Sequence, residues 1–436
     1  MTNRSRVTPR KSSSPEAAPC SREEENLIAE AKPQAEAVAC KPSRENRNGG
    51  FSRGLLSLAG VLLGVTYLAL VFFLMFLNCN VLAVLSLLFI SLLMPGVHHR
   101  MVTDLFGVGM KSFVFWAQVV GGLRPIYYGE GVNSLLEKDK KSKLIIGNHL
   151  SFVDTFCLIS MGHAAGEVQG MRAFTKNAIK WGMPVIGWGA AFVNFIFLRR
   201  NFEKDKAMIK VQMKALAANS KFYSSGNFWL VIFPEGTRAT PDKLEAAKAF
   251  ARSRDLPVLR HLLVPRTKGL LTVLGEGESA LRESADSVLD VTFGYPCLRG
   301  EGPQPKSVLP SMADLFFRLP AKDKLHHVHV HIRTIPLSDV PKDKAGLESW
   351  TSAVFQEKDK LLDYYQEHGC FPGEARELKL ASWHTLMSNL LILCVSGAAV
   401  ALFLFAALKA LESVAGAAVH YHYNSGEWGS NADKVV

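Results

Sequence analysis

Cysteine is scarce in this sequence, and its spacing excludes the common cysteine-based sites. The 436 residues contain 7 cysteines, and no two of them form a Cys-x-x-Cys pair. This spacing favours neither a disulfide framework nor a zinc site, and a reducing compartment fits it best. The sequence also lacks internal repeats and the Gly-x-Ser-x-Gly motif that marks the nucleophile of many α/β hydrolases.

Acidic residues are outnumbered, and the resulting charge limits the class of partner. There are 50 Lys and Arg residues against 39 Asp and Glu, which gives a net charge of +11. This balance suits an anionic partner, such as a nucleic acid, an anionic lipid surface or a phosphorylated substrate. Hydrophobic residues make up 48% of the chain and charged residues 20%, a composition that excludes an intrinsically disordered protein.

Two long stretches lack charge altogether, which excludes a wholly soluble protein. Residues 55–77 form the first stretch, and they are long enough to cross a hydrocarbon core about 30 Å thick. Asn78-Cys79-Asn80 interrupts the run, and the uncharged residues 81–94 reach only about 21 Å as a helix. We predict a membrane hairpin over 51–94, whose second arm is either a thin crossing or a re-entrant segment. Basic residues flank this hairpin on both sides and favour a cytosolic location for both flanks.

The second uncharged stretch completes the predicted division of the chain. Residues 385–408 lie between His384 and Lys409 and predict a transmembrane helix. Residues 1–50 are polar and carry alternating charge, which is typical of a disordered tail and not of a signal or transit peptide. The predicted parts are a disordered polar tail (1–50), a membrane hairpin (51–94), a soluble-looking domain (95–382), a transmembrane helix (383–410) and a short tail (411–436).

Short apolar runs alternate with helical patterns in the 95–382 domain. The helical window 243–254 is one example of the patterns between the runs. This alternation predicts an α/β fold, with a mixed sheet flanked by helices. The predicted strands are 144–146, 172–175, 195–198, 229–233, 261–264, 289–293 and 328–332.

The most specific chemical pattern joins a histidine to a carboxylate five residues later. An apolar strand ends in Asn148-His149, and Asp154 follows. Ligands collect at the carboxyl ends of strands in open α/β sheets. If Ser151 caps a helix that begins at Phe152, Asp154 lies in its first turn. The carboxylate can then accept a hydrogen bond from one imidazole nitrogen, which leaves the other nitrogen free as a base. The spacing also fits an ordinary loop histidine beside a helix cap.

Three more apolar segments end in charged residues. The segment 229–233 runs into Pro234-Glu235-Gly236-Thr237-Arg238, where glycine permits a tight turn and arginine offers a planar fork that suits phosphate. The segments 187–200 and 263–269 end in Arg199-Arg200 and in Arg266 with Lys268. Parallel strands would gather these residues on one rim with His149. One base and several cations suit a phosphate-bearing nucleophile, whereas a nucleic acid calls for a basic stripe with interleaved aromatic residues.

These segments resemble, in order, the motifs of the glycerolipid acyltransferase family. NHLSFVD is similar to the family's Asn-His-x4-Asp motif, PVIGWGAAFVNFIFLRRN to its second motif, FPEGTR to its third and LVPRTKG to its fourth. DVTFGYP, VHVHIRTIPLSDVP and FQEKDKLLDYY resemble the carboxyl-terminal region of eukaryotic lysophosphatidic acid acyltransferases and their lysocardiolipin relatives. The resemblance implies a glycerol-3-phosphate acyltransferase-like fold for the domain.

The resemblance also implies roles for individual residues. His149 is implied as the general base that acts on the acceptor hydroxyl, and Asp154 as its orienting partner. Close relatives carry an acidic residue before the second-motif arginine, whereas this chain has Arg199, which adds positive charge there. The implied substrate-binding residues are Arg200, Glu235, Gly236, Thr237, Arg238, Pro265, Arg266 and Lys268.

The implied reaction is acylation of the sn-2 hydroxyl of lysophosphatidic acid to give phosphatidic acid. Acyl-CoA is the implied co-substrate, and no cofactor or metal is expected. The expected partners are acyl-CoA, lysophosphatidic acid or a related lysophospholipid, and membrane lipids, with no nucleic acid. The expected location is the endoplasmic reticulum membrane, with several crossings and the catalytic domain facing the cytosol.

Four alternatives stay open at this point. Another lysophospholipid, such as lysocardiolipin or lysophosphatidylinositol, can be the acceptor. Ser151 close to His149 allows a lipid hydrolase. His327, His329 and His331 share one face of a strand and allow a zinc site, although no carboxylate or cysteine partner is evident. A membrane hairpin with basic faces also fits a non-catalytic lipid-binding protein.

Overall fold

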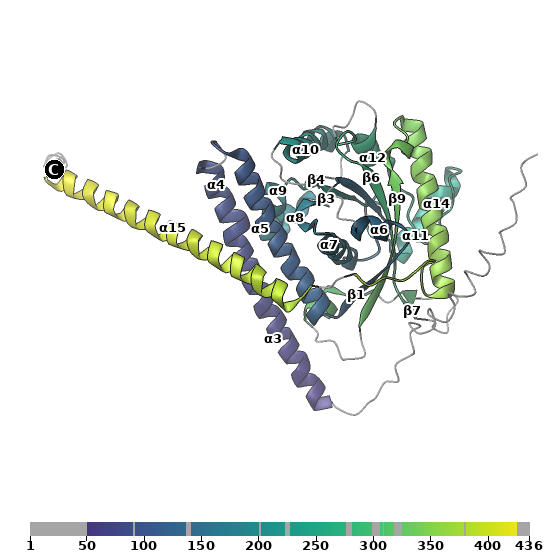
Figure 1. Ribbon diagram of the computed structural model, residues 1–436, viewed down its shortest axis with the longest axis horizontal. Helices are drawn as coiled ribbons and strands as arrows, with labels where there is room; N and C mark the ends of the chain where they lie inside the picture. Colours follow the sequence, from purple (N-terminus) through teal and green to yellow (C-terminus); the bar gives the residue numbers. More distant parts are fainter. Residues whose placement is uncertain are drawn as a thin grey trace, which may run out of the picture. The chain divides into compact units, whose positions relative to one another are not determined.

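A seven-stranded sheet forms the centre of the computed structural model of the chain (Figure 1). The predicted tail over 1–50 lies, except for Gly50, outside the described residues, and so does the end of the chain after Asn424. The structure describes residues 50–89, 92–136, 141–199, 202–222, 227–275, 281–298, 306–307, 309–317, 325–378 and 381–424.

The central sheet is mixed, as predicted. Its strand order is β1-β9-β6-β2-β5-β3-β4, and only the β6–β9 pair is antiparallel. The carboxyl ends of β6, β2, β5, β3 and β4 therefore lie at one edge of the sheet. Strands β7 and β8 form a separate antiparallel pair. The strand bounds are β1 Leu123–Tyr128, β2 Lys143–Gly147, β3 Met171–Lys176, β4 Ile196–Leu198, β5 Trp229–Ile232, β6 Ser287–Gly294, β7 Cys297–Leu298, β8 Lys306–Ser307 and β9 His326–Pro336.

Two of the strand expectations need correction. The predicted strand 261–264 is irregular chain, because the backbone N–H groups of His261 and Leu263 donate to side-chain carboxylates instead of to a neighbouring strand. Strand β1 was not predicted. It contains Pro125 and is the end strand of the sheet, paired with β9 on one side and joined on the other side by a single bridge between Tyr127 and Arg376. Proline is tolerated on such edge strands. The other six predicted strands are confirmed.

Helices cover both faces of the sheet, and the strand residues alternate between two hydrophobic clusters. In β2, Ile145 packs into the cluster that contains residues of α3 (Gly50–Met75), α5 (Pro95–Phe115) and α7, whereas Leu144 and Ile146 pack with residues of α10, α12 and α14. This alternation is what a strand buried on both faces requires. The helices between and beside the strands are α6 Gly131–Leu136, α7 Val153–Ala165, α8 Asn177–Gly182, α9 Pro184–Phe192, α10 Phe202–Phe222, α11 Pro241–Ser253, α12 Thr267–Leu274, α13 Met312–Phe316 and α14 Lys344–His368, with short 3-10 turns at Val168–Gly170 and Leu337–Asp339.

The predicted break at Asn78-Cys79-Asn80 is wrong. Helix α3 (Gly50–Met75) continues through a π-helical segment (Phe76–Leu82) into α4 (Ala83–Phe89). The side-chain nitrogens of the two asparagines have protein partners, because Asn78 Nδ2 donates to the carbonyl oxygens of Leu74 and Leu393 and Asn80 Nδ2 donates to that of Val185. The side-chain nitrogens are therefore satisfied inside the helical run, whereas the Oδ1 atom of each asparagine is buried without a hydrogen-bond partner in the described part of the chain.

The second arm of the hairpin is a helix that the sequence did not reveal. Helix α5 (Pro95–Phe115) returns along α3 and α4 and ends in a π-helical segment at Trp116–Val120. Its antiparallel direction is set by contacts of Ser86 with His98 and of Tyr67 with the carbonyl of Ser112. Residues 81–89 of the predicted second arm instead prolong the first arm.

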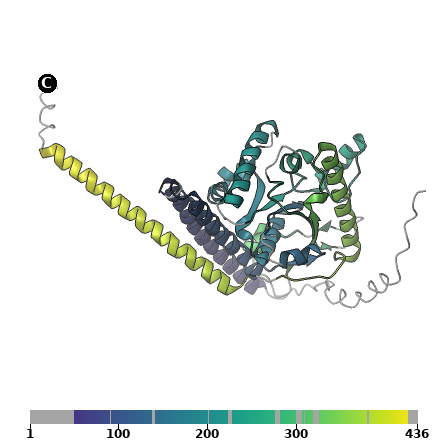
Figure 2. The same ribbon diagram turned by 45° about the horizontal axis from the view of Figure 1, so that its top comes forward.

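The carboxyl-terminal helix α15 begins at Trp383 and runs to Asn424. Its start agrees with the prediction, but the helix continues past residue 410 into the predicted tail. The first part of α15 packs beside α3 and α5 (Figures 1 and 2). Two helical stretches, Leu58–Leu87 and Trp383–Ala415, are long and apolar enough to cross a membrane, judged by length and composition only.

Candidate active site

Asn148-His149 follows β2 at the edge of the sheet where parallel strands end. The last residue of the strand, Gly147, packs closely against Phe233, because a Cβ there would lie 3.0 Å from the ring, closer than most side-chain contacts. The fully buried Asn148 side chain is fixed to strand β6, since its Nδ2 donates to the Phe293 carbonyl at 3.2 Å and its Oδ1 accepts from the Phe293 amide at 2.8 Å. The backbone that carries His149 is therefore held between two strands.

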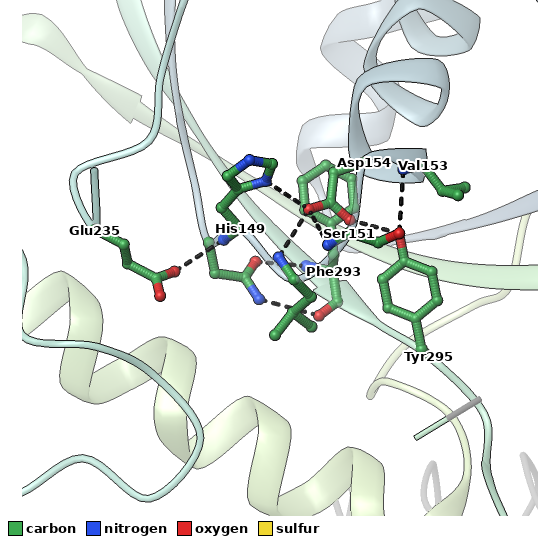
Figure 3. Close-up of polar contacts among 9 residues, drawn as sticks. His149, Ser151, Val153, Asp154, Glu235, Phe293 and Tyr295 are labelled. Carbon is green, nitrogen blue, oxygen red and sulfur yellow. Dashed lines mark hydrogen bonds and ion pairs between the residues drawn. The ribbon is translucent and has the colours of Figure 1, made fainter. Parts of the chain in front are cut away.

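His149 and Asp154 form a hydrogen-bonded pair (Figure 3). Asp154 lies in the first turn of α7, and its Oδ2 lies 2.9 Å from His149 Nδ1. The same oxygen accepts from the backbone amides of Leu150 at 2.8 Å and Ser151 at 2.9 Å. A carboxylate oxygen only accepts hydrogen bonds, so Nδ1 of His149 must carry the proton that faces it. In this tautomer, Nε2 is left as an acceptor. The predicted local geometry of the pair is thus present.

Tyr295 completes the surroundings of the carboxylate and was not predicted. Its hydroxyl donates to the other oxygen of Asp154, Oδ1. Burial and the nearby Asp154 carboxylate raise the pKa of Tyr295 well above its usual value, so the phenol stays a donor. The residue lies within DVTFGYP, which carried the family resemblance, but the 141 residues that separate it from Asp154 hid this contact.

The His149 ring is oriented by an aromatic neighbour. It stacks on Phe233 with the ring centroids 4.3 Å apart and an angle of 17° between the planes. The side chain is 20% exposed, whereas the Asp154 side chain is fully buried. Within the described part of the chain, Nε2 has no hydrogen-bond partner. The site therefore presents a partly exposed imidazole ring in a fixed orientation, which is an arrangement that suits a general base.

Glu235 connects three of the predicted motifs through backbone groups (Figure 3). Its Oε1 accepts from the His149 amide at 2.8 Å, and its Oε2 accepts from the Leu263 amide at 3.2 Å. The residue is 1% exposed, and this burial raises the pKa of the carboxyl to about 8. Both oxygens face the protein backbone, so the geometry favours a bracing role. Its role in substrate binding stays a prediction.

The third and fourth motifs are joined at a turn beside this brace. Gly236 has a positive φ of 69°, which glycine adopts without strain. The Arg266 side chain lies beside it, about where a Cβ on Gly236 would make contact, and the Arg266 amide donates to the Pro234 carbonyl at 2.8 Å. A backbone bond from Ala239 to the His149 carbonyl, also 2.8 Å, ties the same turn to the base.

The remaining predicted binding residues lie at or near this turn. Arg238, Arg266 and Lys268 are exposed, and Thr237 and Pro265 are half-buried. Lys243 was not predicted: its Nζ donates to Thr237 Oγ1 at 2.8 Å and to the Arg238 carbonyl at 3.2 Å. The sequence feature that could have identified Lys243 is its position shortly after the third motif, in the first turn of α11. Several exposed cations therefore lie in or near this turn.

The second motif is only partly described. Arg200 lies outside the described residues. The neighbouring Arg199 is exposed, and its backbone amide donates to both carboxylate oxygens of the buried Asp205, at 2.9 and 3.0 Å. An acidic residue at position 199 is therefore not needed to fix this strand end, because Asp205 fixes it through the backbone.

The histidines of β9 have a different environment. His329 Nδ1 lies 2.8 Å from the Tyr128 hydroxyl, and burial lowers the pKa of His329 to about 4. In the ranges that the structure describes, no group of three or more His, Cys, Asp or Glu side chains is arranged to hold a metal ion.

Comparison with known families identifies two matching regions. The family profile described as Acyltransferase matches residues 130–274, and the profile described as Acyltransferase C-terminus matches residues 321–392. The first region contains His149, Asp154 and the turn at Gly236, and the second contains β9 and α14.

Individual relatives are similar over longer stretches. A protein of Arabidopsis thaliana named "Probable 1-acyl-sn-glycerol-3-phosphate acyltransferase 5" is 28% identical over 341 residues, which cover 78% of this chain and 80% of that protein. Another from Arabidopsis thaliana, named 1-acyl-sn-glycerol-3-phosphate acyltransferase 2, is 32% identical over 55% of both chains. The human protein named 1-acyl-sn-glycerol-3-phosphate acyltransferase gamma is 29% identical over 59% of this chain and 64% of its own length. The matches thus span between about half and four-fifths of these relatives.

Proposed function

The chain belongs to the glycerolipid acyltransferase family, and from this premise we propose that it transfers the acyl group of an acyl-CoA to the sn-2 hydroxyl of lysophosphatidic acid, which gives phosphatidic acid. The names of the similar proteins support lysophosphatidic acid as the acceptor. The single observation that carries the mechanism is the His149–Asp154 pair with its free Nε2.

The proposed reaction needs a base because an alcohol is a weak nucleophile while it keeps its proton. His149 Nε2 takes the proton of the acceptor hydroxyl as its oxygen attacks the thioester carbon. The resulting imidazolium is stabilised by Asp154, which faces Nδ1. The tetrahedral oxyanion collapses, the carbon–sulfur bond breaks, and the imidazolium returns the proton to the coenzyme A thiolate. No acyl-enzyme intermediate is required.

The cations beside the base suit the phosphate of the acceptor. We assign this phosphate to the turn at Gly236, with Arg238 and Arg266 as donors and Lys268 nearby. Arginine offers paired donors that match phosphate oxygens, and the Arg266 side chain already lies against Gly236. Gly236 also allows the positive φ at this turn. Arg200 and Thr237 belong to the same proposal through the family resemblance.

The two apolar helical stretches support a membrane location for the reaction. Acceptor and product are both lipids, so a site close to the bilayer surface gives them direct access. We propose that the chain resides in the endoplasmic reticulum membrane and crosses it more than once, with the acyltransferase domain on the cytosolic side. The apolar stretches at Leu58–Leu87 and Trp383–Ala415 are the physical basis for this proposal.

An acceptor panel tests the proposal. The full chain in nanodiscs receives one acyl-CoA together with lysophosphatidic acid, lysocardiolipin or lysophosphatidylinositol, and coenzyme A release and lipid products are followed. His149→Ala measures the background, and His368→Ala, an exposed histidine at the end of α14, is the matched control. We expect the fastest transfer to lysophosphatidic acid. Faster transfer to an acceptor with a larger headgroup would overturn the substrate assignment, and release of free fatty acid without an acceptor would indicate a hydrolase.

A further inference from the structure

Helix α14 contacts the proposed site from outside the region that carries the motifs. One turn of this helix places Lys358 and Asp359 next to each other, and both are buried, with 0% and 7% of their surfaces exposed. Buried charges are costly unless they are paired and hydrogen-bonded. Their partners are therefore informative.

Lys358 holds together the ends of the two central strands. Its ammonium donates to the Val291 carbonyl at 2.6 Å and to the Ile146 carbonyl at 3.2 Å, and it is paired with Asp290. Ile146 lies three residues before His149 in the chain. Val291 lies two residues before Phe293, to whose backbone the Asn148 side chain is bonded. The ammonium thus fixes the two strand ends that carry the base and its tyrosine neighbour.

Asp359 holds a different part of the site. Its Oδ2 accepts from the Arg260 amide and its Oδ1 from the His261 amide, each at 2.8 Å. This irregular segment leads directly to Leu263, which donates to Glu235, and on to Arg266. The carboxylate takes the place of a neighbouring strand for these amides. It fixes the segment that carries the cations of the fourth motif.

We propose that Lys358 and Asp359 are positioning residues, with Lys358 acting through the ends of β2 and β6 on His149 and Asp359 acting through the 260–266 segment on Arg266. The assignment rests on the proposed function. Two consecutive residues on one rigid helix fix the distance between the base and the phosphate-binding cations. The region matched by the Acyltransferase C-terminus profile thereby holds the base and the phosphate-binding cations in fixed positions relative to each other.

Separate effects on kcat and KM test this assignment. A displacement of about 1 Å at a reacting group costs on the order of 10²-fold in rate. We expect Lys358→Met to lower kcat on the order of 10²-fold with a KM for lysophosphatidic acid within about twofold of wild type. We expect Asp359→Asn to raise this KM about tenfold and to lower kcat by no more than about threefold.

Two variants of the same helix serve as controls. Lys360→Met removes an exposed lysine, and Val354→Ala removes buried volume from the same helix without touching either set of bonds. Both variants should keep the wild-type KM. Their kcat should also equal that of wild type once it is divided by the folded fraction, which thermal unfolding measures. If Lys358→Met and Asp359→Asn behave like Val354→Ala, with activity that follows the folded fraction alone, the positioning role is refuted.

Hydrogen exchange gives a readout that does not depend on activity. Amides of 259–266 should exchange faster in Asp359→Asn, and amides of 147–151 should exchange faster in Lys358→Met. Unchanged or uniformly faster exchange would overturn the proposal. A wild-type protein that shows no transfer to lysophosphatidic acid would refute the proposed function, while the exchange pattern would still decide the positioning role. Asp359→Asn keeps the size of the side chain, so it decides the question by itself if Lys358→Met does not fold.

Discussion

Two histidine-bearing regions lie on the same sheet, and their partners make them chemically different. His149 follows β2, faces the Asp154 carboxylate at 2.9 Å and is 20% exposed. His329 lies within β9, faces the Tyr128 hydroxyl at 2.8 Å and is 7% exposed. A carboxylate stabilises an imidazolium, whereas a buried phenol does not. The comparison shows that the candidate base is distinguished by its hydrogen-bond partner and its exposure, and not by the presence of a histidine alone.

The largest contrast is expected from changing the two partners. Asp154→Asn keeps the shape of the side chain but removes the charge that stabilises the His149 imidazolium, so kcat should fall on the order of 10²-fold. Tyr128→Phe removes the partner of His329 and should leave kcat within about twofold. Coenzyme A release with lysophosphatidic acid measures both. Equal effects of the two substitutions would remove the distinction between the regions.

A smaller effect is expected from the tyrosine behind the carboxylate. Tyr295→Phe removes the hydrogen bond to Asp154 Oδ1, which contributes about 1 kcal/mol, so kcat should fall about fivefold. Tyr364→Phe changes an exposed tyrosine of α14 and is the matched control. If the two variants have the same kcat, Tyr295 does not support the base.

The pH dependence of stability also distinguishes the two histidine-bearing regions. At alkaline pH the relevant group is Glu235, which accepts a hydrogen bond from the His149 amide. Burial raises the pKa of Glu235 from 4.5 to about 8, so its contribution to stability is full below the unfolded pKa and is lost as pH rises through the folded one. Glutamine does not titrate. Glu235→Gln should therefore lose less thermal stability between pH 6 and pH 9 than wild type, with kcat lowered about threefold because one backbone donor loses its acceptor. Thermal unfolding at both pH values tests this prediction. An equal loss of thermal stability in wild type and Glu235→Gln would contradict it.

The smallest effect on activity is expected at His329, where the pH dependence has the opposite sign. Burial lowers the pKa of His329 from 6.5 to about 4. Its contribution is therefore full above the unfolded pKa and is lost as pH falls through the folded one. His329→Gln should reduce the loss of thermal stability between pH 7 and pH 4, while kcat at pH 7 stays within about twofold of wild type. A large loss of kcat would show that β9 takes part in the reaction.

The sequence revealed those parts of the site whose residues are close along the chain. His149 and Asp154 are five residues apart, so a strand end and a helix start suffice to bring them together. The bonds from Tyr295 to Asp154 and from the His149 amide to Glu235 span 141 and 86 residues. They depend on the order of β6, β2 and β5 in the sheet, which local patterns do not encode.

The expectations that failed have the same origin. Asn78 and Asn80 are signals of a chain break when they face water, but backbone carbonyls on α15 and α9 accept hydrogen bonds from their side-chain nitrogens inside a helix. The apolar run at 261–264 has the composition of a strand, yet its amides bond to Glu235 and Asp359. In both places, groups that are far away in the sequence form hydrogen bonds that local patterns do not reveal.

The most direct test of the central claim replaces the two histidines in one assay. His149→Ala and His329→Ala are prepared in nanodiscs, and phosphatidic acid formation from acyl-CoA and lysophosphatidic acid is measured. Each rate is divided by the folded fraction of the variant, which thermal unfolding measures. The account predicts that His149→Ala loses between about 10² and 10⁴-fold in kcat, whereas His329→Ala stays within about threefold of wild type. Retention of the wild-type kcat by His149→Ala would contradict it.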